Sequence, residues 1–285
     1  MDHFFIIANH TKEPSVREAS AIKKYLEERG KVCYVQNGIP CENTGAYRFT
    51  DPAEIPPDTQ CVLVLGGDGT LLQAARDLTD TSYPLLGINM GRLGYLAEIE
   101  LVNVYSALDR LMADQYTVEN RMMLSGICER KSAGPVVDVA LNDIVISRRG
   151  RLRVVDFKIS VNGEFLCSYR ADGIILSTAT GSTGYSLSAG GPIVSPDAFL
   201  QLLTPISPHT LNSRPVVLPD TARIHVQLGG SGLPDEEGAD VTFDGDTAAH
   251  ILPGDGITVS RSEKTTRLIK VNNTSFVEIL RKKMN

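Results

Sequence analysis

The sequence is poor in the features that would direct it to a membrane or out of the cell. No apolar run approaches the ~18 residues that a membrane-spanning helix needs. The N-terminus, MDHFFIIANHTKEP, lacks a cationic leader and has only a short apolar core, so we expect no signal peptide. The five cysteines are scattered and contain no C-x-x-C, which argues against a disulfide framework and a zinc knuckle. A cytoplasmic protein without membrane contact is predicted.

The sequence also lacks an excess of positive charge. Its 28 lysines and arginines stand against 34 aspartates and glutamates, for a net charge of -6. Proteins that bind nucleic acid through the phosphate backbone need a basic surface to displace counterions, so a nucleic-acid partner is not expected. A small phosphorylated ligand stays compatible with this balance, because backbone N–H groups and a few local arginines bind phosphate on acidic proteins.

The length of 285 residues suggests two domains at about 150 residues each. Up to about residue 115, apolar strands alternate with helical patterns, and the run CVLVL at 61–65 is typical of a buried parallel strand. This alternation predicts an α/β domain with an open parallel sheet. Strands are expected at 3–8, 31–36, 61–65 and 85–89, and helices at 14–29, 70–78 and 102–112.

After about residue 120 the pattern changes to short β-rich segments, which predict an all-β, sandwich-like second domain. Asn162-Gly163 is a strong hairpin signal between two of them. A helix at 275–283 is expected to return to the first domain. The predicted domains are therefore 1–118 with 272–285, and 119–271. The predicted β segments are 122–129, 136–147, 154–161, 164–169, 173–178, 223–228, 241–243 and 256–260.

The sharpest local feature is the G-G-D-G-T motif at 66–70, directly after the CVLVL strand and before a predicted helix. Glycines let the backbone turn tightly and approach a ligand, and the N–H groups at a helix start favour phosphate. Asp68 lies where ligands of open α/β sheets collect, so it is a candidate base and a candidate metal ligand. A simple strand-to-helix turn is the alternative. The candidate phosphate-binding residues are Gly66, Gly67, Gly69 and Thr70.

A second feature is a loop dense in glycine, serine and threonine at 179–191, which follows an apolar strand that begins after Asp172. Hydroxyl groups and free backbone N–H groups suit a diphosphate or a ribose. Tyr185 is the only aromatic residue in the loop, so it is a candidate to stack on a base. A polar linker is the less favoured interpretation.

Other polar residues admit two interpretations each. Asn142 and Asp143 lie in the apolar stretch LNDIVIS, where one of them must face inward and find either a ligand or a structural partner. The 244–246 segment, D-G-D, is interpreted as a turn rather than a metal pair. Nearby arginines are candidates to supply positive charge, although a solvated turn is favoured for the first two; they are Arg148, Arg149, Arg151, Arg153 and Arg170.

Together these motifs resemble the NAD kinases. The resemblance rests on G-G-D-G-T at 66–70, the N-D pair at 142–143, the block D-G-x-x-x-S-T-x-T-G-S-T-x-Y-S-L-S-A-G-G-P at 172–192, the segment 204–215, and N-x-G-x-L-G-[FY]-L at 89–96. Ala179 and Gly184 depart from the usual Pro and Ala, Asp143 from the commoner Glu, and Asp246 from a frequent Gln. These departures concern affinity and specificity more than the reaction.

The resemblance implies a kinase that transfers phosphate from ATP, or another phosphate donor, to the adenosine 2′-hydroxyl of NAD to give NADP. It also implies Mg²⁺ or another divalent metal, a homodimer or homotetramer, and Asp68 as the catalytic residue. Combined with the residue-based candidates, the expected NAD-binding residues are Asp68, Gly69, Asn142, Asp143, Arg153, Arg170, Asp172, Thr183, Gly184, Tyr185, Ser186, Leu187, Ser188, Ser207 and Asp246.

Two other functions stay open from the sequence. G-G-D-G-T is shared with lipid kinases that act on diacylglycerol-like alcohols, although no basic amphipathic helix for membrane docking is present. A non-catalytic dinucleotide sensor is the other alternative, and Asp68 argues against it because a sensor needs no base beside the phosphates.

Overall fold

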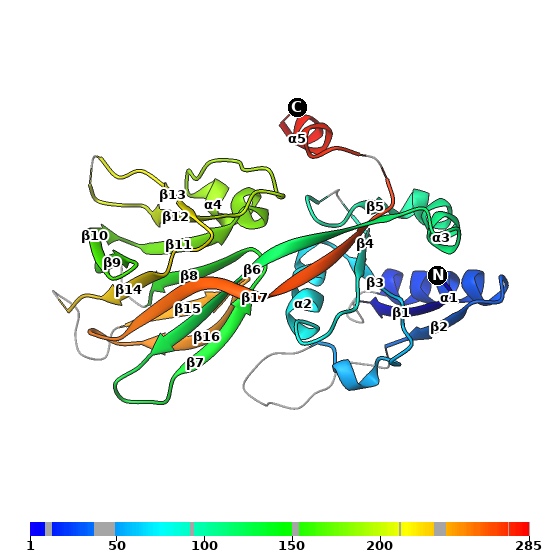
Figure 1. The fold of residues 1–285 in the computed structure, drawn as a ribbon, viewed down its shortest axis with the longest axis horizontal. Coiled ribbons are helices and arrows are strands. Elements are labelled where there is room, and N and C mark those ends of the chain that lie inside the picture. The colour runs from blue at the N-terminus through cyan, green and yellow to red at the C-terminus, as the bar shows by residue number, and fades with distance from the viewer. Residues whose placement is uncertain are drawn as a thin grey trace. The chain divides into compact units, whose positions relative to one another are not determined.

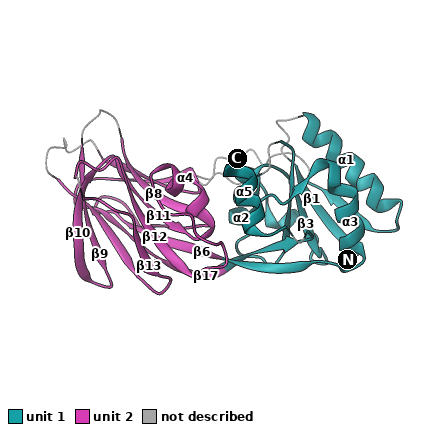
Figure 2. Ribbon diagram, turned by 90° about the horizontal axis from the view of Figure 1, so that it is seen from above, with its two compact units in different colours: residues 1–121, 265–285 teal, residues 122–264 magenta. Residues whose placement is uncertain are grey.

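The computed structural model describes residues 1–8, 13–36, 49–91, 94–149, 154–210, 212–230, 238–272 and 274–284. The chain divides into two compact units, which Figure 2 distinguishes by colour. Unit 1 contains residues 1–121 and 265–285, and unit 2 contains residues 122–264. Among the described helices, none combines the length and the apolar character that a membrane span requires.

Unit 1 is an α/β fold whose central strands are all parallel (Figure 1). The strand order is β2-β1-β3-β4, and β5 and the end of β17 also pair with β4. The elements are β1 (His3–Ala8), α1 (Glu13–Glu27), β2 (Val32–Val35), η1 (Pro52–Glu54), β3 (Cys61–Gly66), α2 (Asp68–Asp77), β4 (Leu85–Asn89), β5 (Ile99–Glu100), η2 (Leu101–Asn103), α3 (Val104–Met112) and α5 (Phe276–Met284).

The parallel sheet of unit 1 is buried because its strands are apolar on both faces. Every residue of β3 and β4 is buried, as expected of strands that helices cover on both sides. Phe4 and Ile6 of β1 share a core cluster with Ile22 of α1 and Leu108 of α3. Helix α2 contacts β3 and β4. The predicted α/β class with an open parallel sheet is confirmed, and α5 belongs to this unit.

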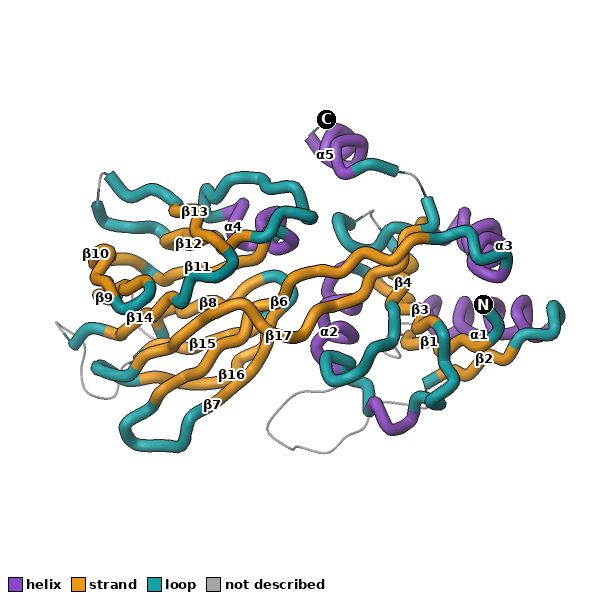
Figure 3. Tube along the Cα trace, viewed as in Figure 1, coloured by secondary structure: helices purple, strands orange, loops and turns teal. Residues whose placement is uncertain are grey.

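Unit 2 is a β-sandwich, whose strands Figure 3 shows in orange. One sheet is antiparallel with the order β13-β12-β11-β8-β15-β16, and the other contains β10, β9, β14 and β17 with β6 and β7. The elements are β6 (Thr117–Glu129), β7 (Val136–Ala140), β8 (Asp143–Arg148), β9 (Val155–Val161), β10 (Glu164–Ala171), β11 (Gly173–Thr178), η3 (Thr180–Thr183), α4 (Tyr185–Ser188), β12 (Leu200–Ile206), β13 (Val216–Pro219), β14 (Ile224–Leu228), β15 (Ala239–Phe243), β16 (Asp246–Ile251) and β17 (Gly256–Lys270). The first residues of β6 and the last residues of β17 belong to unit 1.

Alternating apolar residues of both sheets build the core of unit 2. Ile144 and Ile174 of one sheet and Phe157 and Ile257 of the other belong to a single buried cluster. Such alternation is what two sheets packed face to face require. The predicted hairpin at Asn162-Gly163 is confirmed: both residues have positive φ, 52° and 85°, as the tight turn between β9 and β10 demands.

Several details of the predicted elements are wrong. The segment 136–147 was expected to be one β piece, but it forms two strands that are interrupted just before Asp143. The loop at 179–191 is not open throughout, because it contains the short helices η3 and α4. The sequence pattern also omitted β12, β13 and β16, and it stopped β17 ten residues before its end at Lys270.

Candidate functional site

Asp68 lies at the first position of α2, and its carboxylate is held by a later loop of the same unit. Oδ2 accepts the N–H of Tyr95 at 2.8 Å, and Oδ1 accepts the N–H groups of Leu96 at 3.2 Å and Ala97 at 3.0 Å. A carboxylate has about four lone-pair directions. Among the described residues, Oδ2 therefore has one hydrogen bond and keeps room for a second donor.

Glycines keep this arrangement close-packed. A Cβ on Gly66 would overlap the side chain of Thr70, and a Cβ on Gly94 would overlap the carboxylate of Asp68 itself. Gly67 and Gly69 have no atom within 4 Å of such a Cβ, so their surroundings are open. The first glycine of the motif thus serves helix packing, whereas Gly67 and Gly69 leave the backbone accessible to a ligand.

The start of α2 has no side-chain cap. Gly67 is the N-cap residue and offers no side chain to bond the first N–H groups. Those groups carry the positive end of the helix dipole and attract phosphate oxygens. The strand-to-helix turn that the sequence predicted at residues 66–70 is therefore present with an N-terminus suited to an anion.

Asn142 and Asp143 lie at the break between β7 and β8 in unit 2, rather than in the middle of a strand as expected. Asp143 is buried. The side-chain Oδ1 of Asn142 is also buried and has no hydrogen-bond partner among the described residues. Buried polar atoms normally have a partner, so this orphaned acceptor indicates a position where a ligand donates a hydrogen bond.

Asp244 organises this break. Its carboxylate accepts the backbone N–H groups of Leu141 and Asn142 at 2.7 Å each and of Asp143 at 3.0 Å. Asp244 and Gly245 have positive φ, 49° and 94°, so the D-G-D segment forms the turn between β15 and β16 that the sequence favoured.

Two carboxyl groups thus lie near one another. Burial, and second the charge of Asp244, raise the pKa of Asp143 to about 7. Hydrogen bonds to an ionised carboxyl favour the ionised form. A ligand group that donates a hydrogen bond to Asp143 would therefore lower its pKa. Strongly perturbed carboxyl groups are enriched at functional sites.

The glycine- and hydroxyl-rich segment after β11 is folded tightly against this break. A Cβ on Gly181 would overlap the backbone of Asn142, while one on Gly184 would lie 3.4 Å from Asn142 Nδ2 and 3.7 Å from Asp143 Oδ2. Tyr185 follows at the start of α4 with 47% of its surface exposed. The structure therefore brings together the 142–143 pair and the segment 181–185, and it leaves the tyrosine ring accessible for stacking.

Asp172 pairs with Arg148, not with Arg170. Arg148 Nε donates to Asp172 Oδ1 at 2.8 Å, and the side chain of Arg148 is only 18% exposed. The favoured interpretation of Arg148 as part of a solvated turn is wrong, because the register of β8 and β11 places it beside Asp172. Arg170 instead lies 3.4 Å from Asp156 on the neighbouring strand β9.

The other candidates differ in accessibility. Ser186 is buried, and its hydroxyl bonds to Thr204 Oγ1 at 3.0 Å. Ser188 and Ser207 are exposed, and Ser207 has a positive φ of 45°. Arg153 lies outside the described residues. The half-buried candidates are Thr183, Gly184, Leu187 and Asp246.

Several residues that shape the site carried no role in the sequence-based prediction. The three N–H donors to Asp68 come from the N-x-G-x-L-G-[FY]-L motif at 89–96 and the residue after it; the motif was noticed but given no function. Asp244 was noticed only as a turn residue. Backbone donors leave no signature in side-chain identity, so Gly94, which must lack a Cβ, was the available signal.

A family model described as "ATP-NAD kinase N-terminal domain" matches residues 4–116, and one described as "ATP-NAD kinase C-terminal domain" matches residues 141–271. NAD kinase of Agathobacter rectalis is 44% identical over 285 residues, covering 100% of this chain and 99% of the relative. NAD kinase of Lachnospira eligens is 41% identical over 295 residues, covering 100% of both chains.

Two solved structures are similar over the full length. A yeast NADH kinase complexed with NADH superimposes with a TM-score of 0.86 and 26% identity, covering 100% of this chain and 87% of that chain. An NAD kinase from Archaeoglobus fulgidus in complex with ATP gives a TM-score of 0.76 and 26% identity, covering 99% of this chain and 98% of that chain.

Proposed function

The chain belongs to the ATP-NAD kinase family, and from that premise we propose that it transfers a phosphoryl group from ATP to the adenosine 2′-hydroxyl of NAD, giving NADP. The observation that carries the proposal is the Asp68 carboxylate, oriented by three backbone N–H groups beside an uncapped helix N-terminus. This arrangement combines a proton acceptor with a phosphate-binding turn.

In the proposed reaction, Asp68 Oδ2 accepts the proton of the 2′-hydroxyl while the hydroxyl oxygen attacks the terminal phosphorus of ATP. The bond between that phosphorus and the bridging oxygen breaks, and ADP leaves with the electron pair. Phosphoryl transfer depends mainly on positioning and charge neutralisation. The backbone at Gly67 and Gly69 would hold the donor phosphates, because no side chain obstructs it.

Residues of unit 2 would recognise NAD. The carboxyl of Asp143 and the orphaned Asn142 Oδ1 offer acceptor oxygens, so they suit the hydroxyl and amino groups of the adenosine part. The exposed ring of Tyr185 would stack on a base. Asp172 accepts hydrogen bonds but repels phosphate, so its place is toward the ribose or the nicotinamide amide. The remaining proposed NAD-binding residues are Asp68, Gly69, Arg153, Arg170, Thr183, Gly184, Ser186, Leu187, Ser188, Ser207 and Asp246.

A divalent metal, Mg²⁺ or another, belongs to this proposal. The described residues contain no group of three or more His, Cys, Asp or Glu side chains that could hold an ion by themselves. Mg²⁺ is commonly held by one or two carboxylates together with substrate phosphates and water. A metal that arrives with the nucleotide would be held mainly by the phosphates and water, with Asp68 as the candidate carboxylate. When bound, it would neutralise charge that develops on the transferred group.

A homodimer or homotetramer and a cytoplasmic location stay predictions from the sequence. The resemblance to the family supports the predicted oligomer.

The predicted cytoplasmic location draws on the cysteines. The four within the described residues are free, and burial raises the pKa of the Cys128 thiol to about 11. Such thiols are protonated and unreactive at neutral pH.

The test is an assay of the purified protein with NAD, ATP and Mg²⁺ that measures NADP. A diacylglycerol-type lipid kinase would leave NAD unchanged, and a dinucleotide sensor would bind NAD without turnover; either result would contradict the proposal. Asp68→Asn keeps the shape but removes the base, so kcat is expected to fall by ~10²–10⁴-fold. A variant that keeps more than about a tenth of the wild-type kcat would remove Asp68 from the catalytic role.

A further inference from the structure

The loop that orients Asp68 is itself anchored by a buried carboxylate, Glu98. The loop donates three N–H groups to Asp68, from Tyr95, Leu96 and Ala97. Glu98 is the next residue in the chain, and only 3% of its side chain is exposed. A buried carboxylate is costly unless it has partners, so the partners of Glu98 determine where the loop can lie.

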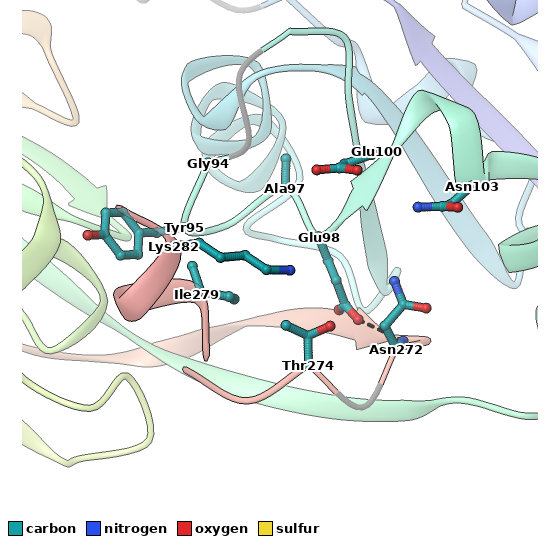
Figure 4. A pocket seen from close by; sticks show the side chains of 10 residues that line it. All are labelled: Gly94, Tyr95, Ala97, Glu98, Glu100, Asn103, Asn272, Thr274, Ile279 and Lys282. Carbon is teal, nitrogen blue, oxygen red and sulfur yellow. Dashed lines mark hydrogen bonds between the residues drawn. The ribbon is translucent and has the colours of Figure 1, made fainter. Parts of the chain in front are cut away.

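Both partners of Glu98 come from the carboxy-terminal part of the chain. Oε1 accepts the backbone N–H of Asn272 at 2.7 Å, the bond drawn as a dashed line in Figure 4. Within the described part of the chain Oε2 has no hydrogen-bond partner, but it lies 3.2 Å from the ammonium of Lys270, which is 15% exposed. Lys270 is the last residue of β17 and Asn272 follows the strand, so both lie more than 170 positions along the chain from Glu98.

The same loop also contacts helix α5. The ammonium of Lys283 lies 4.6 Å from the centroid of the Tyr95 ring. Tyr95 and Glu98 line a cavity of about 90 Å³ together with Ile279 and Lys282 of α5, and Figure 4 labels these side chains. The loop is thus fixed on one side by Asp68 and on the other by the carboxy-terminal segment.

We infer that Glu98 is a positioning residue for Asp68: its buried contacts with Lys270 and Asn272 fix the loop whose N–H groups aim the catalytic carboxylate. This inference rests on the role of Asp68 in the proposed function. A displacement of reacting groups by about 1 Å costs ~10²-fold in rate. Loosening the loop therefore lowers kcat, while the NAD-binding residues of unit 2 keep their own contacts.

Glu98→Gln tests the inference. The substitution keeps the side-chain size and an acceptor for Asn272, but it removes the charge that faces Lys270. We expect kcat to fall by ~10- to 100-fold, with NAD affinity by calorimetry within about threefold of wild type. The backbone amides of residues 95–97 should exchange with solvent faster than in the wild-type protein when the two proteins are compared under conditions that give them the same free energy of unfolding.

Asp77→Asn is the matched control. Asp77 is also buried, lies on α2 as Asp68 does, and accepts the N–H groups of Phe49 and Thr50 at 2.9 Å each. Its replacement loosens a different segment of the same unit. It should lower the melting temperature while kcat and the exchange of amides 95–97 stay at wild-type values.

The outcomes separate the two proposals. If the wild-type protein forms no NADP, the proposed function fails. If the wild type is active, Asp68→Asn is inactive and Glu98→Gln keeps its kcat and its slow amide exchange, the inference alone is overturned.

Should Glu98→Gln not fold, native-state exchange of the wild type decides. The free energy of opening that hydrogen exchange measures should be the same for the amide of Asn272 as for the amides of residues 95–97. An Asn272 amide that opens while the loop amides stay protected would refute the anchor.

Discussion

The buried carboxyl of Asp143 makes the stability of this protein depend on pH, and Asp143→Asn isolates that dependence. Burial and the charge of Asp244 raise the pKa of Asp143 from 3.8 to about 7 in the folded protein. Between these values the folded state binds the proton that the unfolded state has released. The stability associated with a protonated Asp143 is therefore complete below about pH 4 and is lost as the pH rises towards 7.

The magnitude follows from the two pKa values. Their difference, from 3.8 to about 7, corresponds to ~4 kcal/mol at about 1.4 kcal/mol per pKa unit. Asparagine has nearly the same shape and stays neutral at every pH. The free energy of unfolding of Asp143→Asn, minus that of the wild type, should therefore increase by ~4 kcal/mol between about pH 4 and 8.

Urea unfolding followed by circular dichroism at unit intervals of pH measures this difference. Asp197→Asn, which replaces an exposed aspartate of the same unit, is the control for removing one negative charge. A difference that stays constant across the range, or that increases as the pH falls, would refute the assignment of a raised pKa to Asp143.

The affinity for NAD should fall in Asp143→Asn, whereas the stability above pH 7 should rise. An ionised Asp143 accepts hydrogen bonds from NAD in the proposed site, and losing a hydrogen bond to a charged group costs ~1.5–3 kcal/mol. Asp143→Asn should thus raise the Kd for NAD by roughly 10- to 150-fold while it stabilises the protein above pH 7. A variant that is less stable and binds NAD normally would contradict both parts.

Three further substitutions test other parts of the site. Gly94→Ala places a methyl group against the Asp68 carboxylate, so kcat measured by steady-state kinetics should fall by ~10²-fold. A wild-type kcat in this variant would show that the reaction tolerates a displaced carboxylate. Tyr185→Ala should weaken NAD by ~1–3 kcal/mol and ATP hardly at all, and equal losses in calorimetry would remove the stacking role. Asp172→Ala removes the carboxylate that the half-buried Arg148 Nε contacts at 2.8 Å, so it should lower the melting temperature as well as raise the KM for NAD by roughly 10- to 150-fold. A destabilised variant with an unchanged KM for NAD would leave Asp172 only a structural role.

The elements of the fold were predictable where their signals are local. The apolar run at 61–65 forms β3, which ends at the glycine turn, and Asn162-Gly163 forms its hairpin. The errors lie where the local pattern is ambiguous. The stretch LNDIVIS looks like one strand, yet the Asp244 carboxylate captures three successive N–H groups at 141–143 and ends β7 there. Strands β12 and β13 lie in proline-containing segments, which do not alternate clearly.

The composition and the motifs by themselves determined the α/β and β-sandwich classes, the glycine turn with Asp68, and the family. Each depends on residues close in sequence, whose spacing and chemistry are visible without coordinates. Only the tertiary structure determined which groups contact the carboxylates of the site. The N–H groups that hold Asp68 come 27 to 29 residues later, and Asp244 lies 101 residues from the Asp143 amide that it accepts. Arg148 rather than Arg170 pairs with Asp172 because strand register, not proximity in sequence, determines which side chains face each other.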